Sequence, residues 1–176
     1  MIEPLDVVFE QGFVPLLHSL DAILEKATTY AEEKRLDLVN ARLAPDMFTL
    51  AQQIQIATYF ARETPSRLMG REAAHDIGEA ATTIEGMRKQ VSDALASLAL
   101  LDASAFDGAG TRRCTIEPPN VDFYFDMSGD EFLLRWSLPN FYFHLVIAYA
   151  ILRKEGLAIG KLDYLGSVEE FRRSKA

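Results

Sequence analysis

The chain has 176 residues, a length that fits one domain with a single core. Its 26 acidic and 18 basic residues give a net charge of −8, which repels phosphate backbones and disfavours nucleic acid as a partner. One cysteine, Cys114, excludes an internal disulfide framework and favours a reducing, cytoplasmic location. The first residues include acidic side chains where a secretory signal has lysine or arginine, so we expect no targeting peptide.

The first predicted helix covers about residues 3–33, where apolar side chains recur at intervals of three and four. Gly12 and Pro15 interrupt this stripe, and a proline inside a helix removes a backbone donor. We therefore expect a kink or a short break near Phe13. His18 lies off the apolar stripe, which predicts an exposed or boundary imidazole.

A second helix is predicted from Asp46 to about Glu63. Pro45 suits a first helical turn, and Pro65 marks a break at the other end. Apolar side chains form one wide face of this helix. Midway along it stand three glutamines: Gln52, Gln53 and Gln55.

The next segments alternate between loop, helix and strand patterns. Residues 71–79 look like a loop that contains His75, and a third helix is predicted over roughly 80–101. Two short segments, 111–117 and 121–126, flank a proline-rich turn, and the second alternates apolar and polar residues. We expect a small β-hairpin there.

A fourth helix is predicted over about 129–155. Ser128 and Glu131 have the spacing of a capping box at its start, since the serine accepts from a backbone amide and the glutamate reaches back. Pro139 predicts a kink, and Gly156 suits the end of the helix.

Residues 136–152 of this helix carry no formal charge and are rich in aromatic side chains. A membrane-spanning helix needs about 20 apolar residues, and this run, interrupted by Pro139, Asn140 and His144, only reaches the lower limit. We therefore expect no membrane partner and a helix buried by other helices or by a second subunit.

Four helices of this kind predict an all-α four-helix bundle with a small β-hairpin before the last helix. The bundle is expected to occupy residues 1–166 as a single domain, followed by a polar tail at 167–176. One helix is apolar nearly all round, so its outer face is available to a partner subunit.

No catalytic or metal-binding motif is found in the sequence. There is no HExxH, CxxC, GxSxG, GxGxxG or P-loop pattern. Asn140 and His144 share a helix face, but an amide oxygen is a poor ligand for zinc or nickel. Two interpretations follow: a buried hydrogen-bond network that fixes helix register, or a pocket for a small ligand or a weak metal site.

Two segments resemble a known family: LPNFYFHLVIAYAILRKEGLAIGKLDYLG, which begins at Leu138, and ARLAPDMFTLAQQIQIA, which begins at Ala41. They are similar to a branch of the DinB/YfiT-like superfamily that has no assigned reaction. The resemblance covers nearly the whole chain, and it implies a DinB-like four-helix bundle that is often a homodimer.

Better-studied relatives in that superfamily hold a divalent metal with three histidines, and several are thiol-dependent transferases. The resemblance places His144 at the later histidine of the fourth-helix pair and Asn140 at the earlier one. It implies that Gln55, or else Gln52, replaces the second-helix histidine. The candidate pocket is therefore Gln52, Gln55, Asn140 and His144, expected to bind a small molecule and no cofactor. The alternative is a transferase-like enzyme that holds a divalent metal weakly at His144.

Overall fold

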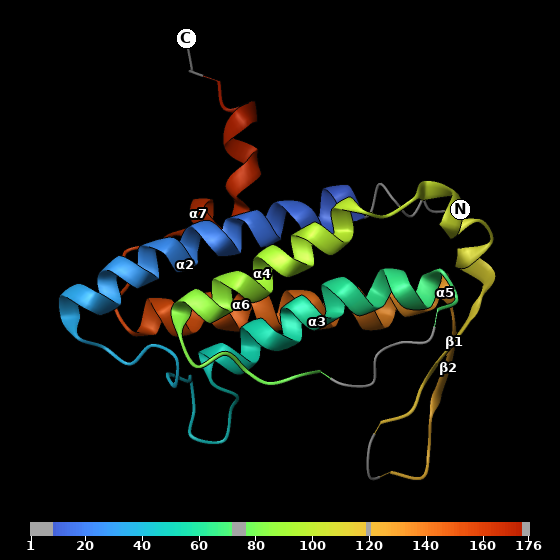
Figure 1. Ribbon diagram of the computed structural model, residues 1–176, viewed down its shortest axis with the longest axis horizontal. Coiled ribbons are helices and arrows are strands. Elements are labelled where there is room, and N and C mark those ends of the chain that lie inside the picture. Colours follow the sequence, from blue (N-terminus) through green and yellow to red (C-terminus); the bar gives the residue numbers. More distant parts are fainter. Residues whose placement is uncertain (1–8, 72–76, 119–120, 174–176) are drawn as a thin grey trace.

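A computed structural model describes residues 9–71, 77–118 and 121–173. Its four long helices lie side by side in a bundle (Figure 1), and a two-stranded hairpin precedes the last of them, as predicted. The long helices are α2 (Val14–Lys34), α3 (Leu50–Leu68), α4 (Ile84–Ala99) and α6 (Leu138–Lys154).

The irregularity predicted near Phe13 is present at the start of α2. A π-helical turn, η1 (Phe9–Phe13), leads directly into α2, and Pro15 lies in the first turn of that helix. A proline is tolerated there because the first amides of a helix have no intrahelical acceptor. The part of the predicted helix before Phe9 lies outside the described residues.

Helix α3 begins later than predicted, at Leu50 instead of Asp46. Thr49 is the N-cap: its hydroxyl accepts from the amide of Gln52, and its own amide donates to the Gln52 side chain at 3.0 Å. This capping box determines the start of the helix, and the proline-acid pair at 45–46 lies in the preceding loop.

The predicted break at Pro65 is wrong, because α3 continues through it to Leu68. Hydroxyls on both sides of the proline donate to carbonyls one turn earlier: Thr64 to Phe60 at 2.6 Å, and Ser66 to Arg62 at 3.3 Å. Hydroxyl bonds of this kind bend a helix slightly without ending it.

The hairpin consists of β1 (Arg113–Ile116) and β2 (Phe125–Ser128), which are antiparallel with Cys114 opposite Met127. The second strand lies about four residues later than predicted. The alternation at 121–125 does not mark a buried face, since Val121, Phe123 and Tyr124 are all exposed. The expected turn residues 119–120 lie outside the described part.

The capping box at Ser128 and Glu131 is confirmed, and it starts α5 (Gly129–Glu131). A π-helical segment, η4 (Phe132–Ser137), then leads into α6, so the distortion expected at Pro139 takes the form of a wider turn just before it. Gly156, with φ of 95°, ends the helix in the left-handed conformation that glycine favours.

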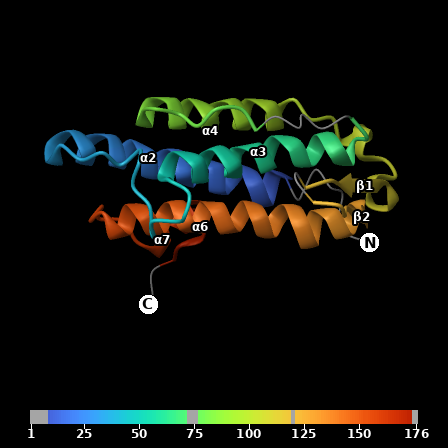
Figure 2. The ribbon, with the colours of Figure 1, turned by 90° about the horizontal axis from the view of Figure 1, so that it is seen from below.

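The core lies where the four helices meet, and the pair α3 and α6 is its most extensive contact. Figure 2 shows α4 and α6 at opposite edges of the bundle, with α2 and α3 between them. The fully buried rings of Phe13 and Phe141 join η1 to α6, with their centroids 4.6 Å apart. A buried hydrogen bond between the hydroxyls of Thr64 and Ser137 joins α3 to η4.

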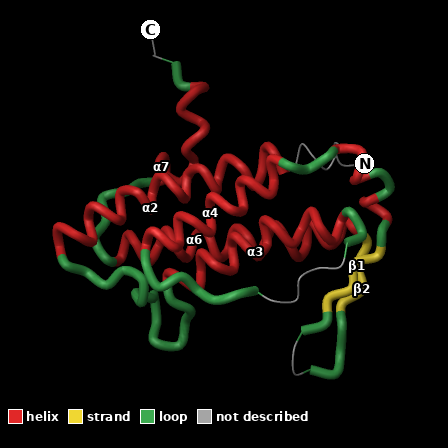
Figure 3. Tube along the Cα trace, in the orientation of Figure 1, coloured by secondary structure: helices red, strands yellow, loops and turns green. Residues whose placement is uncertain are grey.

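Two short helices follow the bundle, α7 (Lys161–Leu165) and η5 (Gly166–Phe171), and both contact α2. Residues 167–176 were expected to form a polar tail, but the first of them belong to η5. The chain here rises away from the bundle (Figure 3). Among the described residues, none of the helices has the length and apolar character needed to cross a membrane.

Gly129 lies where the hairpin meets the bundle, and a side chain would not fit there. A Cβ on Gly129 would lie 1.9 Å from the carbonyl oxygen of Ala109. We expect Gly129→Ala to lower the free energy of unfolding by about 1–3 kcal/mol in urea titrations. Gly160→Ala is the matched control, because its Cβ would make only an ordinary contact at 3.8 Å with Asp163; equal effects of the two changes would contradict this packing.

Candidate functional site

His144 points into the bundle from α6 and is 8% exposed. Its Nδ1 lies 2.7 Å from Oε1 of Gln53 on α3, and its ring is parallel to that of Phe60, with the ring centroids 6.4 Å apart. Burial lowers the pKa of His144 to about 4, so the ring is neutral at physiological pH. The imidazole therefore points inward and faces an amide, but this amide is Gln53 and neither Gln52 nor Gln55.

The amide hydrogen bonds of Gln53 indicate which ring nitrogen carries the proton. Nε2 of Gln53 donates to the carbonyl of Phe48 at 3.4 Å, which directs Oε1 toward the ring. An amide oxygen only accepts, so Nδ1 of His144 must donate. The lone pair of the neutral ring is consequently on Nε2, the nitrogen that remains available as an acceptor or a ligand.

Gln53 is not one of the glutamines that the resemblance singled out. Gln52 belongs to the capping box with Thr49, and Gln55 donates from Nε2 to the carbonyl of Gly78 at 2.7 Å. Residues two apart on a helix are separated by about 200° around its axis, so Gln53 and Gln55 face opposite sides of α3. The structure thus brings His144 together with Gln53, and it orients Gln55 toward the loop before α4.

Two other residues of α3 show which side of the helix carries Gln53. Phe60 and Thr64 lie seven and eleven residues after it, which places all three on one side of α3. That side meets α6 and η4, because Phe60 lies against His144 and Thr64 bonds Ser137. The rotation of α3 about its axis, shown by Phe60 and Thr64, identifies the side that packs on α6. The positions of the glutamines in the sequence do not identify that side.

Asn140 lies one turn before His144 and is half-buried. Its Nδ2 donates to the carbonyl of Trp136 at 2.7 Å, so the amide satisfies a carbonyl at the junction of η4 and α6. His144 with two amides does not fit a transition-metal site, because such metals select imidazole, thiolate and carboxylate. Among the described residues, no group of three histidine, cysteine or acidic side chains could hold a metal ion.

A second polar cluster connects α3 to the hairpin. Glu63 and Arg67 form a buried ion pair, and Arg67 Nη1 donates to the carbonyl of Thr115 at 2.8 Å. Burial, followed by the charge of Glu63, raises the pKa of the nearby Tyr59 to about 12. Burial also raises the pKa of Cys114, which disfavours the thiolate form of this buried side chain. This cluster is structural, and it anchors β1.

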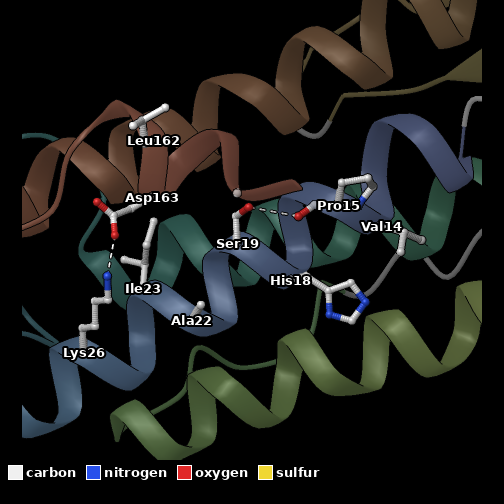
Figure 4. A pocket seen from close by; sticks show the side chains of 10 residues that line it. Val14, Pro15, His18, Ser19, Ala22, Ile23, Lys26, Leu162 and Asp163 are labelled. Carbon is white, nitrogen blue, oxygen red and sulfur yellow. Dashed lines mark hydrogen bonds and ion pairs between the residues drawn. The ribbon is translucent and has the colours of Figure 1, made fainter. Parts of the chain in front are cut away.

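Two grooves run along α2, and His144 lines neither of them. The first, about 560 Å³, lies between α2 and the C-terminal helices (Figure 4), and the second, about 650 Å³, lies between α2 and α4. His18 is exposed, as expected, and lines both grooves together with Val14. Both grooves are mostly apolar, with the Lys26–Asp163 ion pair at 2.5 Å beside the first.

Comparison with known proteins places this arrangement in a family. The sequence profile of a domain of unknown function, DUF1993, matches residues 9–165. The chain belongs to the DUF1993 family. The match spans the four long helices and α7, and it ends just before η5.

A solved structure extends this likeness to the whole chain. The crystal structure of a DinB family member from Shewanella denitrificans is 35% identical to this DUF1993 chain. It matches with a TM-score of 0.78, covering 98% of this chain and 95% of that one. The DinB-like fold implied by the sequence motifs is therefore confirmed. No curated protein matches this chain.

The burial of His144 predicts a specific pH dependence. The pKa of this ring in the folded state, about 4, is below its ordinary value of 6.5, so the unfolded chain binds more protons between these pH values. The stability that the neutral ring contributes is complete above pH 6.5 and is lost as the pH falls toward 4. NMR titration of the histidine ring protons should show a midpoint near pH 4 for His144. In His144→Gln the stability curve should flatten over the same range.

The contact with Gln53 is tested by exchanging glutamines. Gln53→Ala leaves the buried Nδ1 proton of His144 without an acceptor and should reduce stability by about 1–3 kcal/mol. It should also shift the ring resonances of His144. Gln55→Ala removes a different hydrogen bond and should leave those resonances in place. If Gln55→Ala shifts the ring resonances of His144 more than Gln53→Ala does, the contact between His144 and Gln53 is contradicted.

Proposed function

We propose that this protein is a DinB-like binding protein that does not use a metal at His144. The observation that carries this proposal is the 2.7 Å hydrogen bond between His144 Nδ1 and Gln53 Oε1. In this proposal Gln53, in place of the expected Gln55 or Gln52, stands with Asn140 and His144 where the metal-dependent relatives hold three histidines. Both amides donate to backbone carbonyls, so their hydrogen bonds serve the helices.

In this proposal the polar layer of Gln53, Asn140 and His144 fixes how α6 lies against α3. Buried polar groups stabilise one helix register, because any slip leaves them unpaired at a cost of about 1–3 kcal/mol each. A ligand that displaces the hydrogen-bond partners of these buried groups would meet the same cost in free energy.

The predicted pocket of Gln52, Gln55, Asn140 and His144 is narrowed in this proposal, because Gln55 faces away from His144. A molecule that contacts all four would have to replace the bonds to Thr49, Gly78 and Trp136. We therefore propose a ligand that approaches the lone pair on Nε2 of His144 and leaves Gln52 and Gln55 in place. A neutral hydrogen-bond donor suits that nitrogen.

The alternative is a metal-dependent transferase-like enzyme with a degraded site. One observation favours it: the Nδ1 hydrogen bond leaves a neutral imidazole with its lone pair on Nε2, the arrangement of many metal-binding histidines. Gln55 and Asn140 would then add two weak amide oxygens. Their present hydrogen bonds oppose this role.

We also propose that the protein is a cytoplasmic homodimer with no nucleic acid or membrane partner. The net charge of −8 supports the exclusion of nucleic acid, and the buried thiol of Cys114 suits a reducing compartment. Exposed apolar side chains support the dimer: Phe143 and Val146 on α6 are 56% and 45% exposed.

Rebuilding the histidine set tests the metal assignment. The wild-type protein, purified without a histidine tag, should contain no stoichiometric metal and should gain no thermal stability from zinc or nickel. The double variant Gln53→His, Asn140→His supplies three imidazoles across α3 and α6. It should bind zinc and gain about 2.7 kcal/mol at a zinc concentration 100 times its dissociation constant.

The matched control replaces the other glutamine, as Gln55→His with Asn140→His. Because Gln55 faces away from α6, this variant should bind zinc no better than wild type. One metal per wild-type chain that disappears in His144→Ala would instead support the transferase-like alternative.

A further inference from the structure

We propose that the groove between α2 and α4 binds an amphipathic organic cation, whose apolar body lies between the two helices and whose ammonium group pairs with Glu10. This is the second groove described above, with a volume of about 650 Å³. It is separate from the polar layer around His144, because that ring does not line it. The inference therefore goes beyond the proposed function and does not depend on it.

The floor of the groove is apolar and belongs to the core. Phe9 of η1 and Leu98 of α4 form it, and they are only 2% and 6% exposed. Val14 and Leu95 line the groove from the two facing helices. The volume falls within the roughly 300–1,000 Å³ of pockets that enclose small organic molecules. An apolar group bound here is removed from water on the side that faces the core, and this burial contributes affinity.

Three polar side chains line the same groove: Glu10, His18 and Ser92. All three are exposed, and over the residues that the structure describes none of them forms a hydrogen bond or an ion pair with the protein. A ligand can therefore bond them without displacing a protein partner, which is not true of the amides near His144. A few polar groups around an apolar floor are typical of a site for a small molecule.

The helices set the order of these groups along the groove. Glu10, Val14 and His18 follow one another at intervals of four, which places them along one edge. Figure 4 shows the ring of His18 on the side of α2 that is turned toward α4. On the opposite edge, the stretch from Ser92 to Ala99 is about 10 Å long at 1.5 Å per residue. A ligand of about that length spans the groove.

An ion pair between the two helices closes one end of the groove. Nε of Arg88 donates to Oδ1 of Asp21 at 2.8 Å, and Nη2 donates to Oδ2 at 3.1 Å. Arg88 lies one turn before Ser92 on α4, and Asp21 lies one turn after His18 on α2. Because Asp21 already neutralises this guanidinium, the closed end offers no free cation to an anionic ligand.

The other end of the groove is acidic. Glu10 lines it, and the rings of Phe9 and Phe106, with centroids 5.3 Å apart, bring η2 (Ala103–Phe106) against η1. Asp102 is the N-cap of η2 and adds a second carboxylate to this end of the bundle. In the part of the chain that the structure describes, no lysine or arginine lines the groove. An unpaired carboxylate beside an apolar floor selects a cation with an apolar body.

Calorimetric titration of the full chain with octylamine tests this assignment, with octanol and octanoate as probes of the same chain length. Octylamine is protonated at neutral pH and should bind more tightly than either of the others. Ala96→Phe, at an exposed residue that lines the groove, should fill it and abolish binding of all three probes. Leu100→Phe places the same ring outside the groove, at a residue 86% exposed, and should leave binding unchanged.

The role of Glu10 is tested by removing and then reversing its charge. Glu10→Gln should weaken octylamine binding about fivefold, the upper range for an ion pair that solvent reaches, and should leave octanol binding unchanged. Glu10→Lys should reverse the preference, so that octanoate binds more tightly than octylamine. Glu33→Gln removes the same charge from an exposed position of α2 outside the groove and should change none of these affinities.

Three results would overturn the proposal. If no probe binds, the groove is filled by another part of the chain or by a second copy. If octanol binds as tightly as octylamine and Glu10→Gln changes neither affinity, the groove recognises only apolar surface. If octylamine still binds Ala96→Phe, its site lies elsewhere. In each case the proposed function at His144 is unaffected, because that ring does not line the groove.

Discussion

The contact between α3 and α6 is the interaction on which the rest of the structure depends. It buries polar groups of both helices: the Thr64 and Ser137 hydroxyls at one end, and Gln53 with His144 toward the other. Such groups are tolerated inside a bundle only when each finds a partner, and that requirement permits a single register. The aromatic core, with Phe13 against Phe141, then packs around a fixed pair of helices.

This constraint also limits the chemistry at His144. Burial keeps the imidazole neutral, and Gln53 holds its Nδ1 proton. In metal centres of bundles, ligands one turn apart share a helix face, and here that position is occupied by an amide that bonds its own helix. The site therefore has the hydrogen bonding of a structural layer on the scaffold of a DinB-like fold.

Much of the fold follows from the sequence, because hydrophobic periodicity and caps are local signals. The bundle, the hairpin and the Ser128 capping box were predictable in this way. The start of α3 was not, since Pro45 and Asp46 resemble a helix start as well as Thr49 does. The partner of His144 was also missed: choosing among three glutamines requires the phase of α3 relative to α6, and that phase is a tertiary property. The short helices α7 and η5 were missed as well, because their segment has a mostly polar composition with scattered glycines.

The π-helical segment η4 has a consequence for how this chain tolerates changes in length. A π turn holds one residue more than an α turn, so deleting a residue between Phe132 and Ser137 would restore regular winding there. Because the wider turn absorbs that extra residue, its removal would leave the preceding capping box and hairpin in nearly the same rotation about the helix axis. A further deletion, which no π turn absorbs, would rotate the hairpin by about 100° relative to the helix that carries His144.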